Sequence, residues 1–270
     1  MINSGLPLNA YGVLDAFKTA SSQSPAVEQL RTVGYAVIDS GYTSGEVVDI
    51  GERFERISEN YIHEYGRSAL ESINEIDTIR AILAQGDEIF LSIAMNTRLK
   101  SVVEELIIGK FILNQQNGII NPPQKKYSQS AWHRDLPYQH FVSSRPLAIN
   151  ALYCIDDFTT ENGGTYVLPA SHKIEQFPSE DYIRRNAIQV SAKAGSFIVL
   201  DCMLFHCGGF NNTPSPRRAV NHLFTVPYIK QQINLSEAMA EIPLSAEQKS
   251  FLGFDYQIPP SVSSYLNSRK

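Results

Sequence analysis

The feature that most limits the possible folds is the order of residue types from about Lys110 onwards. There, short runs rich in Val, Ile, Phe and Tyr alternate with clusters of Pro, Gly, Asn and Ser. β-Branched and aromatic residues favour strands, and the residues between them favour turns, so the pattern is typical of antiparallel sheets built as a sandwich or barrel. We expect strands at residues 111–120, 129–135, 147–155, 165–168, 196–200 and 218–228.

The first hundred residues differ, because apolar residues recur there every three or four positions, as on one face of a helix. Thr43 is followed three residues later by Glu46, the capping-box pattern, and Val47, Ile50 and Phe54 then share a helix face. The other elements expected in this half are one strand and two helices, at residues 34–39, 87–95 and 97–108.

The sequence contains no repeat and no linker that would divide it, so we expect a single domain over residues 1–270. A mostly helical layer with one strand occupies residues 1–108, a β-rich core follows at 109–230, and an extension closes the chain at 231–270. A polar stretch at residues 169–189 has the length of a functional lid.

Charge and cysteine content limit the expected partners and compartment. The formal net charge is −5, so the chain lacks the positive field that holds nucleic acid. The N-terminus does not resemble a signal peptide, and no apolar run approaches the roughly 18 residues of a membrane span. Three cysteines cannot all pair, which favours a reducing, cytoplasmic location.

The sharpest local motif is Trp132-His133-Arg134-Asp135. On a strand, residues two apart point to the same side, so His133 and Asp135 project together while Arg134 faces away. An imidazole beside a carboxylate supplies two ligands of the two-His, one-carboxylate triad that holds Fe(II). His206, which follows an apolar run and precedes two glycines, is the expected second imidazole.

Arg217 follows His206 by eleven residues, at the start of the next expected strand. A cation at this place could bind an anionic co-substrate. A keto-acid co-substrate such as 2-oxoglutarate chelates iron at one end and needs a fixed cation at its other carboxylate. The planar fork of a guanidinium suits that carboxylate. Arg218 points to the opposite side of the strand and is not interchangeable with Arg217. We expect His63, His140, His172 and His222 to be structural or surface residues.

Six short segments carry a family resemblance: WHRD at 132–135, DD at 156–157, ENGGT at 161–165, LPASH at 168–172, FHCGG at 205–209 and PRRA at 216–219. In this order they resemble the phytanoyl-CoA dioxygenase (PhyH) family of Fe(II)/2-oxoglutarate oxygenases, over roughly residues 30–228. The resemblance implies a mainly β fold with flanking helices, in which a double-stranded β-helix, the cupin-like jelly-roll, forms the core.

The resemblance also implies roles for individual residues. His133, Asp135 and His206 would hold Fe(II), and Arg217 would clamp 2-oxoglutarate. Further contacts to the co-substrate would come from three polar residues, Asn150, Gln116 and Thr165. Two positions depart from the family pattern: Ala170 stands where Gly is frequent, and Gly208 stands where Ser or Thr is frequent. The second departure removes a hydroxyl that would contact the co-substrate.

The implied reaction is oxidative decarboxylation of 2-oxoglutarate by O2, giving succinate and CO2 and oxidising a substrate C–H bond. Asp135 is intact, which argues against the related halogenases, where a small residue replaces this carboxylate. Tyr138 and Gln139, followed by His140 and Phe141, are expected to line the entrance for a small substrate. Without a basic patch for CoA phosphates, a polar or natural-product metabolite is favoured. The oligomeric state stays open.

Three alternatives compete with this interpretation. A zinc site could use Cys202, His206 and Cys207, but structural zinc normally requires four ligands in spaced pairs. A serine hydrolase is disfavoured because no Gly-x-Ser-x-Gly motif is present. A jelly-roll binding module without turnover would keep the same ligands, and succinate release together with metal analysis would distinguish it from an oxygenase.

Overall fold

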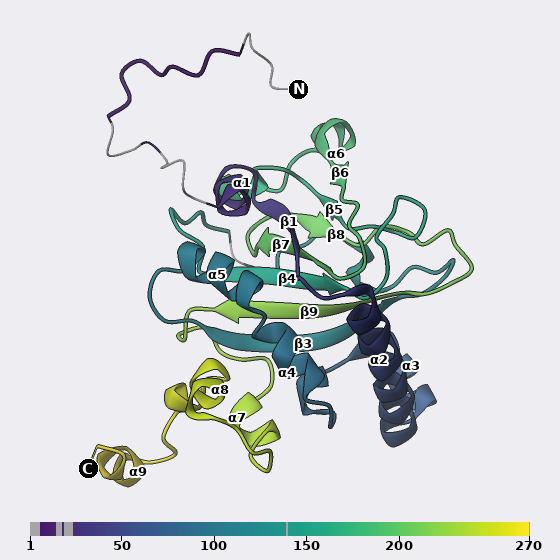
Figure 1. Cartoon of the computed structure of the whole chain (residues 1–270), viewed down its shortest axis with the longest axis vertical. Helices are drawn as coiled ribbons and strands as arrows, with labels where there is room; N and C mark the ends of the chain where they lie inside the picture. Colours follow the sequence, from purple (N-terminus) through teal and green to yellow (C-terminus); the bar gives the residue numbers. More distant parts are fainter. Residues whose placement is uncertain (1–5, 15–17, 19–23, 139, 270) are drawn as a thin grey trace.

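Two antiparallel sheets form the centre of the computed structural model, which describes residues 6–14, 18, 24–138 and 140–269 (Figure 1). The large sheet has the strand order β1-β7-β4-β9-β3-β2, and the small sheet has the order β6-β5-β8. The strands are β1 Tyr35–Asp39, β2 Thr78–Ile79, β3 Ile112–Asn121, β4 Ala148–Cys154, β5 Tyr166–Val167, β6 Ile188–Gln189, β7 Ser196–Asp201, β8 His206–Cys207 and β9 Arg217–Thr225. The expected mainly β jelly-roll core is confirmed.

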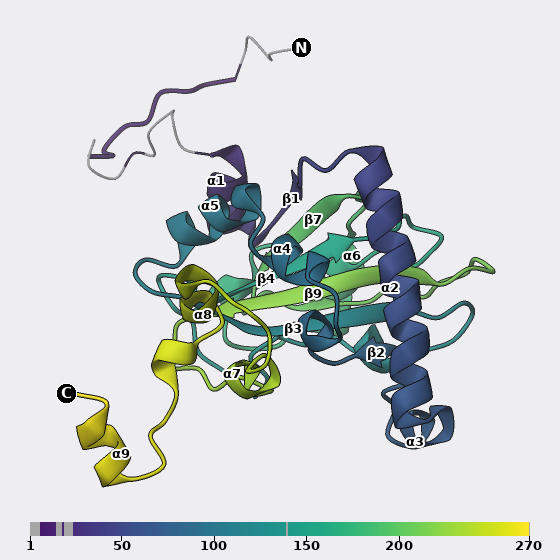
Figure 2. The same ribbon diagram turned by 60° about the horizontal axis from the view of Figure 1, so that its bottom comes forward.

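Helices cover one face of the large sheet (Figure 2). Those with side chains in the core on this face are α1 Pro25–Val33, α2 Ser44–Tyr65, α3 Arg67–Ser72, α4 Ile89–Ala94, α5 Thr97–Leu106, α7 Leu235–Ala238 and α8 Ala246–Phe251. Two further helices, α6 Glu180–Asn186 beside the small sheet and α9 Val262–Asn267 near the C-terminus, add no side chain to that core. The main apolar core lies between this layer and the sheet, where Phe54 of α2 and Phe90 of α4 are fully buried with Phe224 of β9. The opposite face of the sheet is therefore left to the small sheet and the site.

The capping box at the start of α2 forms as the sequence predicts. Thr43 Oγ1 accepts a hydrogen bond from the Glu46 backbone N–H, and the Glu46 carboxylate accepts one from the Thr43 backbone N–H at 2.7 Å. Farther along the helix, Phe54 packs against Gly118 of β3, where an added Cβ would lie 2.8 Å from the Phe54 ring. The glycine lets α2 pack closely on the sheet.

The side chains of β9 point alternately to the two faces of the large sheet. Val220 and Phe224 belong to the helix-side core, whereas Arg217, Ala219 and Asn221 line a cavity on the other side. Successive side chains of a strand point to opposite faces, so this one strand contributes to both the core and the site.

A β-bulge changes this alternation on β3. The register of β3 with β9 shifts between Leu113 and Gln115. As a result Leu113 and Gln116 both face the helices, although their positions differ by three, and Gln115 and Asn117 face the cavity. The bulge therefore decides which polar side chains of β3 reach the site.

Most predicted strands are confirmed with small shifts of their ends, but the strand predicted at 129–135 is wrong. A short 3-10 turn, Ser128–Ser130, occupies its start, and only His133 forms an isolated antiparallel bridge, with His206. The polar stretch at 169–189 is folded rather than a free lid, since it contains α6 and β6. None of its residues lines the cavity. No helix in the described part of the chain has both the length and the apolar character to cross a membrane.

His222 gives the stability of the fold a predictable pH dependence. Its side chain is fully buried, Nδ1 donates to the Ala151 carbonyl at 2.9 Å, and burial lowers its pKa to about 4. The unfolded chain takes up this proton at about pH 6.5, so acid favours unfolding. We expect the free energy of unfolding to fall by about 1.4 kcal/mol per pH unit from pH 6.5 towards 4 because of this residue alone. Urea unfolding at several pH values measures this slope, which His222→Gln should lack. An unchanged slope in that variant would contradict the assignment of the pH dependence to His222.

Candidate metal centre

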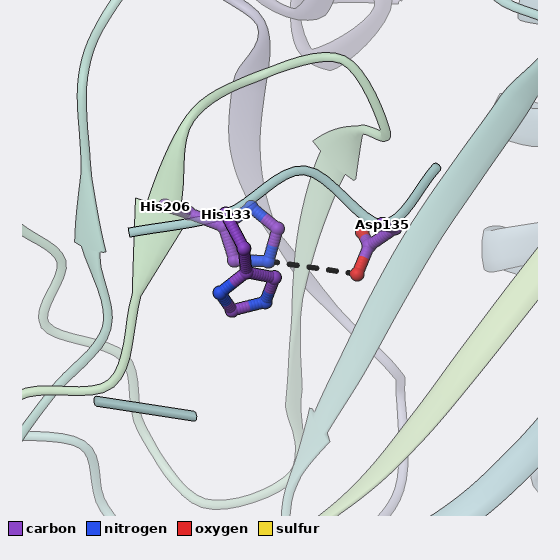
Figure 3. Close-up of side chains that lie close together, drawn as sticks. All are labelled: His133, Asp135 and His206. Atoms are coloured by element: carbon purple, nitrogen blue, oxygen red, sulfur yellow. Dashed lines mark ion pairs between the residues drawn. The ribbon is translucent and has the colours of Figure 1, made fainter. Parts of the chain in front are cut away.

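His133, Asp135 and His206 come together at the edge of the small sheet, as Figure 3 shows. One ligand atom from each of the three side chains lies within 4.8 Å of the others. The two histidines belong to paired segments: each backbone N–H donates to the other residue's carbonyl, at 3.0 and 3.1 Å. The pairing of residues more than seventy positions apart thus brings the two imidazoles side by side, with ring centroids 4.4 Å apart.

Both imidazoles are held so that the same nitrogen faces the centre. Nδ1 of His133 donates to the Ala131 carbonyl at 2.8 Å, and Nδ1 of His206 donates to the Leu204 carbonyl at 3.0 Å. A carbonyl oxygen only accepts hydrogen bonds, so Nδ1 carries a proton and Nε2 is the nitrogen left to bind a metal. Each ring is therefore fixed in the form that coordinates a metal.

Asp135 completes the cluster from the segment that follows His133. Its Oδ1 lies 3.6 Å from Nε2 of His206, and its buried Oδ2 has no hydrogen-bond partner. The Asp135 backbone N–H donates to the Cys202 carbonyl at 3.1 Å, which ties this segment to the end of β7. Two imidazoles and one carboxylate form the donor set that suits Fe(II), and the unsatisfied carboxylate oxygen agrees with that role.

The cluster opens into a cavity of about 370 Å³ between the two sheets. This size lies in the range of about 300–1,000 Å³ that small-molecule sites occupy. Asn150, Leu152, Thr165 and Leu200 are among the residues that line it, together with Arg217. The cavity is large enough for a small metabolite to approach the metal ligands.

Arg217 is a buried cation with unused hydrogen-bonding capacity. Its side chain is 3% exposed, its guanidinium stacks 3.8 Å from the centre of the Phe158 ring, and its Nε and Nη1 have no partner. Burial lowers the pKa of this guanidinium, but an arginine remains charged at neutral pH. A buried positive charge requires a compensating anion, and a carboxylate would pair with it bidentately.

Tyr127 is a residue of this site that the sequence did not reveal. Nη2 of Arg217 donates to the Tyr127 hydroxyl at 3.4 Å. The hydroxyl lies where a side chain at position 208 would stand, since a Cβ added to Gly208 would come within 2.0 Å of it. Burial raises the pKa of Tyr127, so its O–H stays available as a donor. In the sequence, the only hint of this contact is that Gly208 lacks the hydroxyl frequent in the family. That hint does not identify Tyr127 as the residue that supplies a hydroxyl instead.

The other predicted co-substrate contacts divide between the two faces of the sheet. Asn150 and Thr165 are buried and line the cavity. Gln116 does not: its Nε2 donates to the Phe90 carbonyl at 2.6 Å on the helix side. Placing Gln116 among the cavity residues was wrong, because the bulge on β3 turns Gln115 and Asn117 to that face instead.

Among the predicted entrance residues that the structure describes, Tyr138 does not line the cavity. Tyr138 is 91% exposed and adopts φ 62°, in the turn that follows Asp135. The expected substrate contact from Tyr138 is therefore corrected, and Pro137 lines the cavity in its place. Gln139 lies outside the described residues.

The cysteines do not form the alternative zinc site. Cys202 and Cys207 are buried and free, and burial raises the pKa of both thiols, that of Cys207 to about 12. Protonated thiols are poor metal ligands. In the described part of the chain the cluster able to hold a metal consists of the two histidines and Asp135, without either cysteine.

Arg134, which the sequence placed on the other side of its segment, has a structural role. Its guanidinium donates to the carbonyls of Met203 and Ser171 and packs 3.9 Å from the centre of the Phe205 ring. These contacts join the segment of His133 to the one that leads into His206. Arg134 thereby helps to hold the two imidazoles at a fixed separation.

Known proteins match both the sequence and the fold. An uncharacterised protein of Mycobacterium tuberculosis is 30% identical over 246 residues, covering 88% of this chain and 89% of that protein. EctD of Sphingopyxis alaskensis, solved with 2-oxoglutarate and 5-hydroxyectoine, superposes with a TM-score of 0.61 at 20% identity over 77% of this chain and 79% of that one. HygX of Streptomyces hygroscopicus was solved with nickel, 2-oxoglutarate and hygromycin B. It superposes with a TM-score of 0.59 at 16% identity, over 78% of this chain and 90% of that one.

The two solved structures share the jelly-roll fold with this chain. At the sequence level, the family model for phytanoyl-CoA dioxygenase (PhyH) matches residues 30–219, which include all three metal-cluster residues and Arg217. The chain therefore belongs to the phytanoyl-CoA dioxygenase family and is a 2-oxoglutarate-dependent non-haem iron dioxygenase.

Proposed function

We propose that this dioxygenase oxidises a C–H bond of a small polar metabolite, such as a natural-product intermediate, while 2-oxoglutarate is converted to succinate and CO2. The observation that carries the proposal is the presence of two complementary features in one cavity. A cluster of two imidazoles and a carboxylate faces the cavity, and Arg217 lines the same cavity with two unpaired nitrogens.

In this proposal each residue has a separate task. His133, Asp135 and His206 hold Fe(II), which when bound activates O2 for the oxidation. Arg217 pairs with the far carboxylate of 2-oxoglutarate and thereby fixes the orientation of the co-substrate. Asn150 and Thr165 offer hydrogen bonds to the co-substrate from neighbouring parts of the wall. The buried walls exclude water from the reacting groups.

Tyr127 is assigned here to the same carboxylate as Arg217. Its hydroxyl accepts from Arg217 and still has a proton to donate, so it can replace the hydroxyl that Gly208 lacks. We expect Tyr127→Phe to raise the KM for 2-oxoglutarate about tenfold, since a hydrogen bond to a charged group contributes ~1.5 kcal/mol or more. Succinate release against 2-oxoglutarate concentration measures this, with Tyr182→Phe on the exposed helix α6 as control.

A double variant sharpens the test of Tyr127. Tyr127→Ala removes the ring that occupies the space beside Gly208, so Gly208→Ser then has room for its own hydroxyl. The combination should bind 2-oxoglutarate more tightly than Tyr127→Ala alone. If Tyr127→Phe leaves the KM unchanged, or the double variant recovers nothing, the hydroxyl has no role in binding the co-substrate.

We also propose that residues 1–270 act as one catalytic unit. Leu235 and Phe251 of the C-terminal extension belong to the main core cluster, and Gln232 of the same extension lines the cavity. A cytoplasmic location is part of the proposal, supported by three buried cysteines that are free thiols.

The direct test is succinate release by the purified protein with Fe(II), 2-oxoglutarate and O2, measured without added substrate and then with candidate metabolites. Slow release alone and faster release with a substrate are the expected results, because the co-substrate site exists before substrate binds. A protein that binds iron but neither binds nor converts 2-oxoglutarate would overturn the proposal and favour a binding module without turnover.

A further inference from the structure

One end of the cavity is lined by carboxamide side chains, here called the carboxamide cluster: Gln115, Asn117, Asn221 and Gln232. Asn117 of β3 lies directly opposite Asn221 of β9 in the strand register. Gln115 lies two residues before Asn117 on the same face. Nδ2 of Asn117 donates to Oε1 of Gln232 at 3.3 Å, which joins the extension to the sheet. Four amide groups are thus gathered on one wall.

This cluster is separate from the anchor of the co-substrate. Arg217 begins β9, and Asn221 follows it by four residues on the same strand face. At about 3.4 Å per residue, the two positions are about 14 Å apart along the strand. The intermediate position on this face is Ala219, whose small side chain leaves the cavity open between them. The cluster therefore faces the part of the cavity that the carboxylate at Arg217 does not occupy.

The charged side chains that border this end are already paired. The Arg80 guanidinium makes two hydrogen bonds to the Glu75 carboxylate, at 2.5 and 2.6 Å, and donates to Oε1 of Gln232 at 3.1 Å. Because the charges of Arg80 and Glu75 compensate each other, they offer no net charge to a substrate. Binding at this end must depend on hydrogen bonds rather than on ion pairs.

The cluster needs donors as well as acceptors from its ligand. Oδ1 of Asn221 is buried and accepts no hydrogen bond. Within the described part of the chain, the side chain of Gln115 also makes no hydrogen bond and is only partly exposed. A buried acceptor without a partner costs roughly 1–3 kcal/mol, so a ligand that donates to Asn221 recovers that energy. A hydroxyl group can donate to the oxygen of one amide and accept from the nitrogen of another.

We infer that the carboxamide cluster binds the hydroxyl groups of an uncharged, polyhydroxylated substrate such as a glycoside or a cyclitol. This inference deepens the proposed function and rests on it. Leu152 lies opposite Asn221 in the register of β4 with β9, and Ile119 lies beside Ala219 on the same wall. Such apolar side chains pack against the C–H face of a sugar ring while the amides bind its hydroxyl edge.

Ligand-observed saturation-transfer NMR on the full chain, with 2-oxoglutarate present, tests this directly. The probes are methyl β-glucopyranoside, methyl α-mannopyranoside and myo-inositol, compared with butyryl-CoA and L-proline as charged ligands. At least one polyol should bind saturably and more tightly than either charged probe. Asn221→Ala and Gln115→Ala should each weaken its binding at least about tenfold, and Asn186→Ala on the exposed helix α6 should not.

The same samples separate failure of this inference from failure of the proposed function. Calorimetric titration with 2-oxoglutarate reports on Arg217 and Tyr127, which the variants at positions 115 and 221 leave intact. If 2-oxoglutarate binds but no polyol does, or a charged probe binds more tightly, only the substrate class is wrong. The inference also fails if polyol binding is unchanged in both variants. If 2-oxoglutarate neither binds nor turns over, the proposed function itself fails.

Discussion

Replacing His133 with Ala is expected to abolish iron-dependent conversion of 2-oxoglutarate while leaving the fold intact. Nε2 of His133 is one of the three converging ligand atoms, and its Nδ1 is committed to a backbone carbonyl. Removing a group that hydrogen-bonds to a metal ligand usually lowers metal affinity or activity about 10–100-fold. Removing the ligand itself should therefore lower activity roughly a thousandfold or more. Succinate release and bound iron per chain, determined by elemental analysis, should fall together.

Two further variants make this result specific. Asp135→Ala should give the same loss, because Asp135 supplies the one carboxylate of the cluster. His63→Ala should change neither quantity, since His63 is exposed on α2. Full turnover by a folded His133→Ala protein would remove the basis for the metal assignment, and normal iron content in that variant would place the iron elsewhere.

The second large effect is expected at Arg217. Its removal leaves the far carboxylate of 2-oxoglutarate buried without a cation, which typically costs about 2–4 kcal/mol. The KM for 2-oxoglutarate in Arg217→Ala should therefore rise about 30- to 1,000-fold. The kcat at saturating co-substrate should change much less, because the three metal ligands are untouched. Arg217→Lys should lie between, since it keeps the charge but loses the fork.

Arg218 is the matched control, because it is the next residue on the same strand and faces the other way. Its guanidinium pairs with Asp156 at 2.7 Å and with Glu55 at 3.2 Å, outside the cavity. Arg218→Ala should lower the unfolding temperature and leave the KM for 2-oxoglutarate unchanged. An equal rise in KM for both variants would mean that Arg217 acts through stability rather than by direct contact.

The sequence alone determined that the side chains of His133 and Asp135 lie on the same side of their segment, because that signal is local. His133 and Asp135 are two residues apart, and in an extended segment this spacing turns both side chains the same way whether or not a regular strand forms. This explains why the motif predicted the cluster although the strand at 129–135 was wrong. Alternation along β9 likewise separated Arg217 from Arg218, because the pairing of β3 with β9 has no register shift at those residues.

Only the tertiary structure decided which other polar residues reach the site. Because of the bulge in β3, Gln115 faces the cavity and Gln116 faces the helices. No local pattern in the sequence marks that bulge. Tyr127 fills the space left by Gly208, a contact between residues about eighty positions apart that no spacing rule predicts. Local periodicity fixes the direction of a side chain relative to its own strand. Its partners across the cavity depend on strand register and on packing between distant segments, which form only when the whole chain folds.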